Sequence, residues 1–234
     1  MKAVIMAGGL GTRLKPFTHV LPKPLLPLGE HSVLEIVISK LRDHGFDEIF
    51  LTTYYKSNLF ESYLGDGSKY GVKIIYSREE NPLGTAGPLK LLDKHLNEPF
   101  LVINGDVLTN LNFRELMDFH IKNKSDFSLV TKKIDLPMDY GVVYSNENNE
   151  IHKIEEKPKL TKEINAGVYI INPSVIDFIP ENQHMLMTDL LQELIIDPNI
   201  KLYKYLNEEY WLDMGQIKDY ERAKNDFEEG KIIL

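Results

Sequence analysis

Short apolar runs alternate with helix-length segments over the first hundred residues of this 234-residue chain. The runs have the length and composition of buried strands, and several of the intervening segments carry apolar side chains at helical spacing. This order predicts βαβ units, and therefore an α/β fold with a mostly parallel sheet flanked by helices. The expected strands are residues 3–7, 48–53, 72–76 and 100–103, and the expected helices are residues 33–44, 57–64 and 89–92.

The character of the chain changes after about residue 110. Four strand-like runs follow with little helix between them, which predicts a smaller antiparallel subregion closing over one side of the ligand site. These runs are residues 127–131, 141–144, 151–154 and 164–171. Two further helices, residues 187–196 and 217–227, and a strand, residues 201–206, are expected toward the C-terminus.

A glycine-rich loop, residues 8–13, follows the first strand directly. Glycines allow the backbone to turn sharply there, and exposed N–H groups beside the fixed cation of Arg13 form a site for an anion. Lys23 is held between two prolines that stiffen its segment. The set predicts polyphosphate binding, although a plain strand-to-loop turn remains the alternative for the glycines alone. The loop matches neither the P-loop pattern nor the G-x-G-x-x-G dinucleotide pattern.

Two further segments are candidates for ligand binding: one precedes the expected helix 89–92, and the other follows the expected strand 100–103. The small residues of 81–88 form either an ordinary connection into a helix or a flat wall for a nucleobase. Asp106 follows the apolar run 100–103, and a carboxylate at that edge of a parallel sheet repels phosphate unless a hard cation lies between them. Asp106 is therefore a candidate Mg²⁺ ligand, and an Asx turn is the alternative.

Residues 8–14 (GGLGTRL), 22–24 (PKP) and 211–215 (WLDMG) together resemble the signature of the sugar-1-phosphate nucleotidylyltransferases. The resemblance implies a Rossmann-like fold whose antiparallel subregion binds the sugar. It also implies transfer of a nucleotidyl group from a nucleoside triphosphate to a sugar 1-phosphate, with release of pyrophosphate. The form LGTAG at residues 83–87 favours GTP, with a mannose- or heptose-type 1-phosphate. Alternatives are dTTP or UTP with a glucose-type 1-phosphate, a cytidylyltransferase for a non-sugar phosphate, and a non-catalytic nucleotide-sugar sensor.

The resemblance also implies roles for individual residues. Arg13 and Lys23 would be catalytic, and Asp106 and Asp213 would bind Mg²⁺. The nucleotide-binding residues implied are Ala7, Gly8, Gly9, Gly11, Thr12, Leu83, Gly84, Thr85, Ala86 and Gly105. The sugar-phosphate-binding residues implied are Tyr140, Gly141, Glu156, Lys157, Asn165 and Gly167.

Length and composition are those of one globular domain. We expect a single domain over residues 1–234, with a nucleotide half near 1–110, a sugar-phosphate half near 111–234, and no C-terminal β-helix domain. The formal net charge of -8 argues against a nucleic-acid partner, and no apolar run is long enough to span a bilayer. The absence of cysteine fits a cytoplasmic location. The expected partners are therefore the two substrates alone, and a homo-oligomer remains open.

Overall fold

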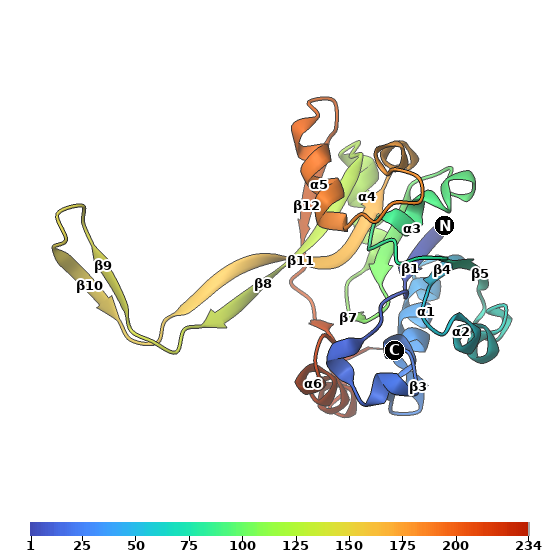
Figure 1. Ribbon diagram of the computed structural model, residues 1–234, viewed down its shortest axis with the longest axis horizontal. Helices are drawn as coiled ribbons and strands as arrows, with labels where there is room; N and C mark the ends of the chain where they lie inside the picture. The colour runs from blue at the N-terminus through green and yellow to red at the C-terminus, as the bar shows by residue number, and fades with distance from the viewer. Residues whose placement is uncertain (234) are drawn as a thin grey trace.

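A seven-stranded sheet forms the centre of the computed structural model, which describes residues 1–233. Its strand order is β12-β8-β11-β6-β1-β4-β5 (Figure 1). Only β11 runs antiparallel to its neighbours, so the α/β fold with a mostly parallel sheet is confirmed. The strands are β1 (Lys2–Met6), β4 (Glu48–Thr53), β5 (Lys73–Arg78), β6 (Phe100–Asn104), β8 (Phe127–Pro137), β11 (Lys159–Ile171) and β12 (Leu202–Leu206).

Helices cover both faces of this sheet because alternate side chains of each strand point to opposite faces. Ala3 and Ile5 of β1 join one buried cluster with α1 (Val33–Asp43), α2 (Ser57–Leu64) and α4 (Phe113–Lys122). Val4 joins a second cluster on the other face. That cluster contains side chains of α3 (Gly87–Lys90), the 3₁₀ segment η6 (Pro173–Phe178) and α5 (Met187–Ile196).

Helix α1 illustrates how the sequence specifies these elements. Ser32 and Glu35 form a capping box, in which the Glu35 N–H donates to Ser32 Oγ at 3.2 Å and the Ser32 N–H donates to Glu35 Oε2 at 2.7 Å. Two of the otherwise unpaired N–H groups at the start of the helix are thereby satisfied. The apolar stripe of Leu34, Ile38 and Leu41 is fully buried against the sheet.

A small antiparallel pair, β7 (Val107–Thr109) and β13 (Trp211–Asp213), joins two segments a hundred residues apart. Asp213 pairs with Val107, and the Met214 N–H donates to the carbonyl oxygen of Asp106 at 3.1 Å. Helix α6 (Ile217–Glu228) follows and packs on a third apolar cluster. This pairing fixes the two aspartates of the predicted metal site next to each other.

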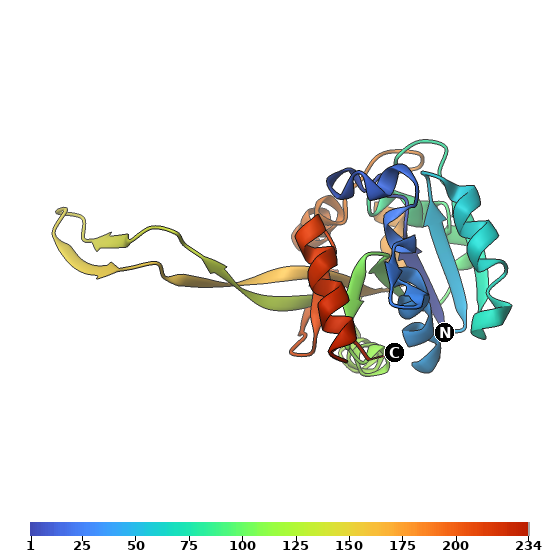
Figure 2. The same ribbon diagram turned by 90° about the horizontal axis from the view of Figure 1, so that it is seen from below.

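The central sheet sends out a long arm, residues 132–164, formed where β8 and β11 continue past the other strands (Figures 1 and 2). Its near part is a two-stranded ribbon, and its far part is a hairpin of β9 (Val142–Ser145) and β10 (Ile151–Glu155). The expectation that these strands close over one side of the site is wrong. The outer part of the β8–β11 ladder, paired from Asn165 to Lys159, instead carries the hairpin away from the body of the protein.

Several expected elements differ from those observed. Helix α3 begins at Gly87 and spans four residues, because Pro88 at its start favours an early helical turn. The prediction omits α4, and it ends the strand at residues 127–131 six residues before Pro137. The remaining short elements are β2 (Pro27–Leu28), β3 (His31–Ser32) and 3₁₀ turns at Thr12–Leu14, Phe17–His19, Lys23–Leu25, Ser68–Tyr70 and Asp93–His95.

Leu234, the last residue of the predicted single domain, lies outside the described residues. The division into a nucleotide half and a sugar-phosphate half stays a prediction, since strands from both halves share one sheet. Among residues 1–233, every helix is too short or too polar to cross a membrane.

Candidate active site

Two adjoining cavities open at the carboxyl ends of β1 and β6, where ligands collect in parallel α/β sheets. The first measures about 350 Å³ and the second about 290 Å³, and both are bordered by Gly9, Leu10 and Asp106. The glycine loop therefore forms the wall between them. We treat the two cavities as one cleft.

The first cavity holds the charged residues predicted for catalysis. Lys23, only 7% exposed, lies in a 3₁₀ turn that Pro22 and Pro24 stiffen, and its ammonium group bonds to the Asp106 carboxylate. Asp213 Oδ1 lies 3.7 Å from Lys23 Nζ. The sequence thus brings one cation between two carboxylates.

Asp213 provides a test of whether a divalent cation fits here. Its Oδ1 is buried and has no hydrogen-bond partner among the described residues, since 3.7 Å to Lys23 exceeds hydrogen-bond distance. Burial and then the Asp106 carboxylate raise the pKa of Asp213, while Lys23 and Arg13 lower it. An unsatisfied oxygen beside a second carboxylate is a hard donor set suited to Mg²⁺.

No set of three or more His, Cys, Asp and Glu side chains gathers anywhere in residues 1–233 in a way that could hold a metal ion. Mg²⁺ does not need such a cage, because one or two carboxylates suffice when substrate phosphates and water complete its shell. Asp106 and Asp213 therefore fit Mg²⁺ that arrives with a phosphate ligand.

Arg13 borders the same cavity from the glycine loop. A Cβ added to Gly215 would lie 3.6 Å from Arg13 Nη1 and 3.8 Å from Asp213 Oδ1, so the guanidinium and the carboxylate flank one glycine. The turn that presents Arg13 depends on Gly11, whose φ of +61° favours glycine. Thr18 Oγ1 donates to the Gly11 carbonyl oxygen at 2.9 Å and fixes this turn.

Gly84 and Thr85 form one wall of the second cavity. Gly84 has φ +81°, and a Cβ there would lie 2.4 Å from the Met185 carbonyl oxygen, so only glycine fits. The Ala86 N–H donates to that same oxygen at 2.9 Å, and the Met187 N–H donates to Thr85 Oγ1 at 2.8 Å. The wall and the segment leading into α5 therefore form one hydrogen-bonded unit.

Glu79 is a carboxylate of the second cavity that the sequence prediction omits. It follows β5 directly, and its Oε2 accepts the Leu83 N–H at 3.0 Å. Burial raises the pKa of Glu79 above its ordinary value of 4.5, although the Leu83 bond acts in the opposite direction. A carboxylate just past the end of a parallel strand is the signal that also marked Asp106.

Replacing Glu79 by glutamine is expected to raise the melting temperature of the ligand-free protein at neutral pH. The reason is that the wild type must hold a partly buried charge, whose raised pKa costs stability progressively as the pH rises above 4.5. Below that pH the carboxyl is protonated in both the folded and the unfolded state, so the two proteins should converge. Thermal unfolding from pH 4 to pH 8, with Glu80→Gln as control, measures this. A difference in melting temperature that does not change with pH would contradict the expectation.

Part of the predicted sugar-phosphate set lies at the base of the arm, next to the cleft. Asn165 Nδ2 donates to Tyr169 Oη at 2.9 Å, and the Gly167 N–H donates to Asn165 Oδ1 at 2.8 Å. A Cβ on Gly167 would lie 2.6 Å from Asn104 Nδ2, and Asn104 borders the second cavity. Gly167 therefore lies against a residue that borders the cleft, and Asn165 holds the turn beside it.

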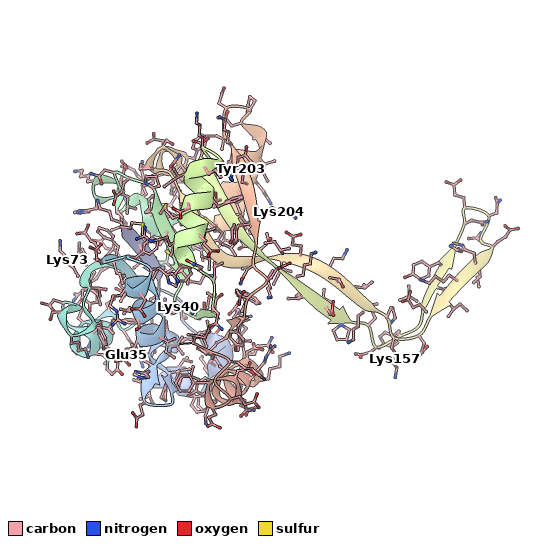
Figure 3. The ribbon with its side chains drawn as sticks, turned by 180° about the vertical axis from the view of Figure 1, so that it is seen from behind. Glu35, Lys40, Lys73, Lys157, Tyr203 and Lys204 are labelled. Carbon is pink, nitrogen blue, oxygen red and sulfur yellow. The ribbon has the colours of Figure 1, made fainter. Side chains whose placement is uncertain are left out.

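The other four predicted sugar-phosphate residues lie apart from the cleft, at the bend between ribbon and hairpin. Tyr140 is 78% exposed, and a Cβ on Gly141 would lie 3.0 Å from Glu156 Oε2. Figure 3 shows Lys157 on the arm, far from the body of the same chain. The sequence pattern grouped these residues with Asn165, and the extended ribbon separates them.

Most predicted nucleotide-binding residues line the cleft, namely Ala7, Gly8, Gly9, Gly11, Thr12, Gly84 and Thr85. The side chains of Leu83 and Ala86 are buried beneath the wall, and Gly105 packs against the Met6 carbonyl oxygen. Cleft residues that the sequence prediction omits are Met6, Leu10, Pro24, Thr52, Tyr54, Glu79, Pro82, Asn104, His184 and Gly215. Of these, Leu10, Pro24 and Gly215 lie within the motifs that carry the resemblance, and Glu79 is a carboxylate just past a strand.

The nucleotidyl transferase family profile matches residues 2–230. Mannose-1-phosphate guanylyltransferase of Mycobacterium tuberculosis is 36% identical over 234 residues, which cover 97% of this chain and 65% of that protein. UTP–glucose-1-phosphate uridylyltransferase of Synechocystis is 35% identical over 241 residues, covering 95% of this chain and 62% of that protein. The chain thus spans slightly less than two thirds of the length of these curated relatives.

Comparison with solved structures supports the same family. The crystal structure of HddC from Yersinia pseudotuberculosis complexed with GMP-PN superposes with a TM-score of 0.74 at 27% identity, covering 97% of this chain and 99% of that one. The resemblance drawn from residues 8–14, 22–24 and 211–215 is therefore confirmed. This chain belongs to the nucleotidyl transferase family.

Proposed function

We propose that this protein transfers a nucleotidyl group from a nucleoside triphosphate to a sugar 1-phosphate and releases pyrophosphate. The observation that carries the proposal is the meeting of Arg13, Lys23, Asp106 and Asp213 at one glycine-lined cleft. The names of the relatives support the same class of reaction. We further propose GTP as the nucleotide and a mannose- or heptose-type 1-phosphate as the acceptor.

The chemistry needs no protein base. A phosphate monoester carries close to two negative charges at neutral pH, because its second pKa is about 6, so its oxygen is already a nucleophile. That oxygen would attack the α-phosphorus in line, forming a new P–O bond while the bond to the pyrophosphate oxygen breaks. The protein must bring two anions together and stabilise the charge that develops on the leaving group.

The charged residues of the first cavity suit these tasks. Arg13 would hold the triphosphate through its planar fork of donors, and Lys23 would neutralise phosphate oxygens around the reacting centre. Asp106 and Asp213 would hold Mg²⁺. When bound, the ion supplies Lewis-acid neutralisation of phosphate oxygens and a template for their orientation.

Glu79 supports guanine as the base. Guanine presents two adjacent donors on one edge, N1–H and N2–H₂, which a carboxylate can accept together. Uracil and thymine offer one N–H between two carbonyl oxygens, and adenine offers its amino group beside an acceptor nitrogen. Glu79 borders the same cavity as the wall of Gly84 and Thr85, so a purine lying on that wall could turn its donor edge toward the carboxylate.

A matrix of nucleoside triphosphates against sugar 1-phosphates, read by pyrophosphate release, tests the proposal. The expected result is the highest kcat/KM with GTP and a mannose- or heptose-type 1-phosphate. A preference for dTTP or UTP with a glucose-type substrate would overturn the substrate assignment. Release only with CTP and a non-sugar phosphate would indicate a cytidylyltransferase, and nucleotide-sugar binding without turnover would indicate a sensor.

Glu79→Gln is expected to lower kcat/KM for GTP about 10- to 100-fold, because a buried polar contact to the base edge is lost. The rate with dTTP should fall much less, so the preference for GTP narrows. Glu80→Gln is the matched control, since Glu80 is the exposed neighbour in the same turn. An unchanged ratio of GTP to dTTP rates would remove Glu79 from base recognition.

A further inference from the structure

The arm, residues 132–164, makes few contacts with the body of its own chain. At its base, Lys132 Nζ donates to the Glu208 and Glu209 carbonyl oxygens, and Glu163 bonds to Lys204. For residues 134–162, every hydrogen bond and ion pair found among the described residues joins two members of the arm. Isolated two-stranded ribbons are at best marginally stable in water, so this arm is expected to have a partner.

The hairpin at the end of the arm has two different faces. Val143 lies directly opposite Ile154, and Ile151 pairs with Ser145 on the same side of the hairpin. All three apolar side chains are exposed, Val143 to 55%, Ile151 to 63% and Ile154 to 66%. An apolar face of this kind is normally covered.

The opposite face of the hairpin is polar and already satisfied. Lys153 Nζ lies 2.8 Å from Glu155 Oε2 and 5.0 Å from the centre of the Tyr144 ring. Tyr144 Oη also donates to the same Glu155 oxygen at 3.4 Å. The hairpin therefore has one polar face whose charged groups are paired, and one apolar face that is exposed.

The bend between ribbon and hairpin cannot reach the cleft of its own chain. The ladder is paired continuously from Thr131 opposite Asn165 to Pro137 opposite Lys159. At about 3.3 Å per residue, the far end of this ladder stands about 20 Å from Thr131, and Tyr140 and Lys157 lie beyond it. Bringing these two residues back would require breaking the ribbon.

The rim of the cleft offers a complementary surface. Leu10 is exposed and borders both cavities, and Phe17 and Val20 are exposed in the following segment, where Thr18 Oγ1 donates to the Gly11 carbonyl oxygen. The bend residues Tyr140, Glu156 and Lys157 do not reach the cleft of their own chain, although Asn165 and Gly167 lie beside that cleft. A second copy of this chain carries both the missing bend residues and an identical rim.

We propose that two copies of this chain exchange their arms, so that the bend of each arm, with Tyr140, Glu156 and Lys157, completes the cleft of the other copy. The hairpin face of Val143, Ile151 and Ile154 would cover the partner's apolar rim. The exchange is reciprocal because a two-fold axis makes each copy both donor and acceptor. The role of Lys157 in this exchange, which is to hold the acceptor's phosphate, rests on the proposed function.

Complementation between two impaired variants tests the exchange. Lys23→Ala removes a cation of the cleft, and Lys157→Ala removes a cation of the arm, so each variant alone should have little activity. In a mixed dimer, the intact cleft of the Lys157→Ala chain receives the intact arm of the Lys23→Ala chain. Coexpression at equal levels gives half mixed dimers with one whole site each, so about a quarter of wild-type activity should return. No recovery, or full activity of Lys157→Ala alone, would overturn the proposal.

Cross-linking gives a readout that does not depend on activity. The chain has no cysteine, so Glu156→Cys in one copy and Leu10→Cys in the other can be joined selectively by a short bis-maleimide. The expected product is a covalent pair of twice the mass of one chain, formed only in the mixture. The matched control replaces Leu10→Cys by Ile121→Cys, an exposed position on α4. Absence of the pair would overturn the exchange even if pyrophosphate release is observed, and its presence without any turnover would contradict the proposed function alone.

Discussion

Lys23→Ala is expected to lower kcat for nucleotidyl transfer about 10²- to 10³-fold, with a much smaller change in KM. Removing one preorganised charged group aimed at the reacting centre has effects of this size, because that group stabilises charge that develops mainly in the transition state. Lys23 is buried in a turn that two prolines stiffen, so its place in the cleft is set before the phosphates arrive. Steady-state pyrophosphate release, with both substrates varied, measures kcat and KM separately.

Lys15→Ala is the matched control for this variant. Lys15 is a solvent-exposed cation in the same segment and does not border the cleft. Its loss should change kcat less than threefold or so, since exposed charges are strongly screened. Circular dichroism and thermal unfolding of Lys23→Ala verify that the fold persists. Near-normal kcat in a folded Lys23→Ala protein would remove Lys23 from the reacting centre.

Asp106→Asn is expected to lower kcat/KM about a thousandfold at a fixed Mg²⁺ concentration, and chelation of Mg²⁺ should lower it at least as much. A thousandfold corresponds to about 4 kcal/mol, within the several kcal/mol that a Lewis-acidic ion supplies to phosphoryl chemistry. Asparagine keeps the shape of the side chain but carries no charge, so it cannot match the carboxylate as a ligand for a hard cation. Pyrophosphate release over a titration of MgCl₂ measures the effect.

Ion binding can be followed without turnover. Mn²⁺ is a paramagnetic substitute for Mg²⁺, and its binding in the presence of nucleotide should weaken in both Asp106→Asn and Asp213→Asn. Asp66→Asn serves as control, because Asp66 lies in an exposed turn after α2 and binds the Ser68 N–H. Wild-type Mn²⁺ affinity in both cleft variants would show that the ion is held elsewhere.

The sequence was sufficient for the sheet and for the centre of the cleft. Strands β1, β4 and β6 are buried on both faces, so their apolar runs are unambiguous, and the rule that ligands collect at carboxyl strand ends locates Asp106. Asp213 lies beside it through the β13–β7 pairing. That pairing is a contact between distant segments, and only the family resemblance, not local periodicity, anticipated it.

Other features of the structure are harder to predict from the sequence, for physical reasons. Alternation along a strand indicates which face is buried, but it does not indicate how far a ladder extends beyond its sheet, so the sequence predicts a subregion that closes over the site and not an arm. Helix α4 did carry local signals, because Asn112 Oδ1 accepts the Arg114 and Glu115 N–H groups and an apolar stripe follows. Glu79 carried the same strand-end signal as Asp106. His184 carried none, since it reaches the cleft from an irregular segment.

Hydrogen bonds join the wall at Gly84 and Thr85 to the segment that leads into α5. This connection has an evolutionary consequence. If a nucleobase lies on this wall as proposed, its orientation would depend on Met185, a residue a hundred positions downstream that is absent from the cavity lining. Insertions or deletions near this residue would tilt the platform without altering any atom that touches the nucleotide. Such changes would alter the nucleotide preference of the proposed site, and a comparison of binding residues alone would overlook them.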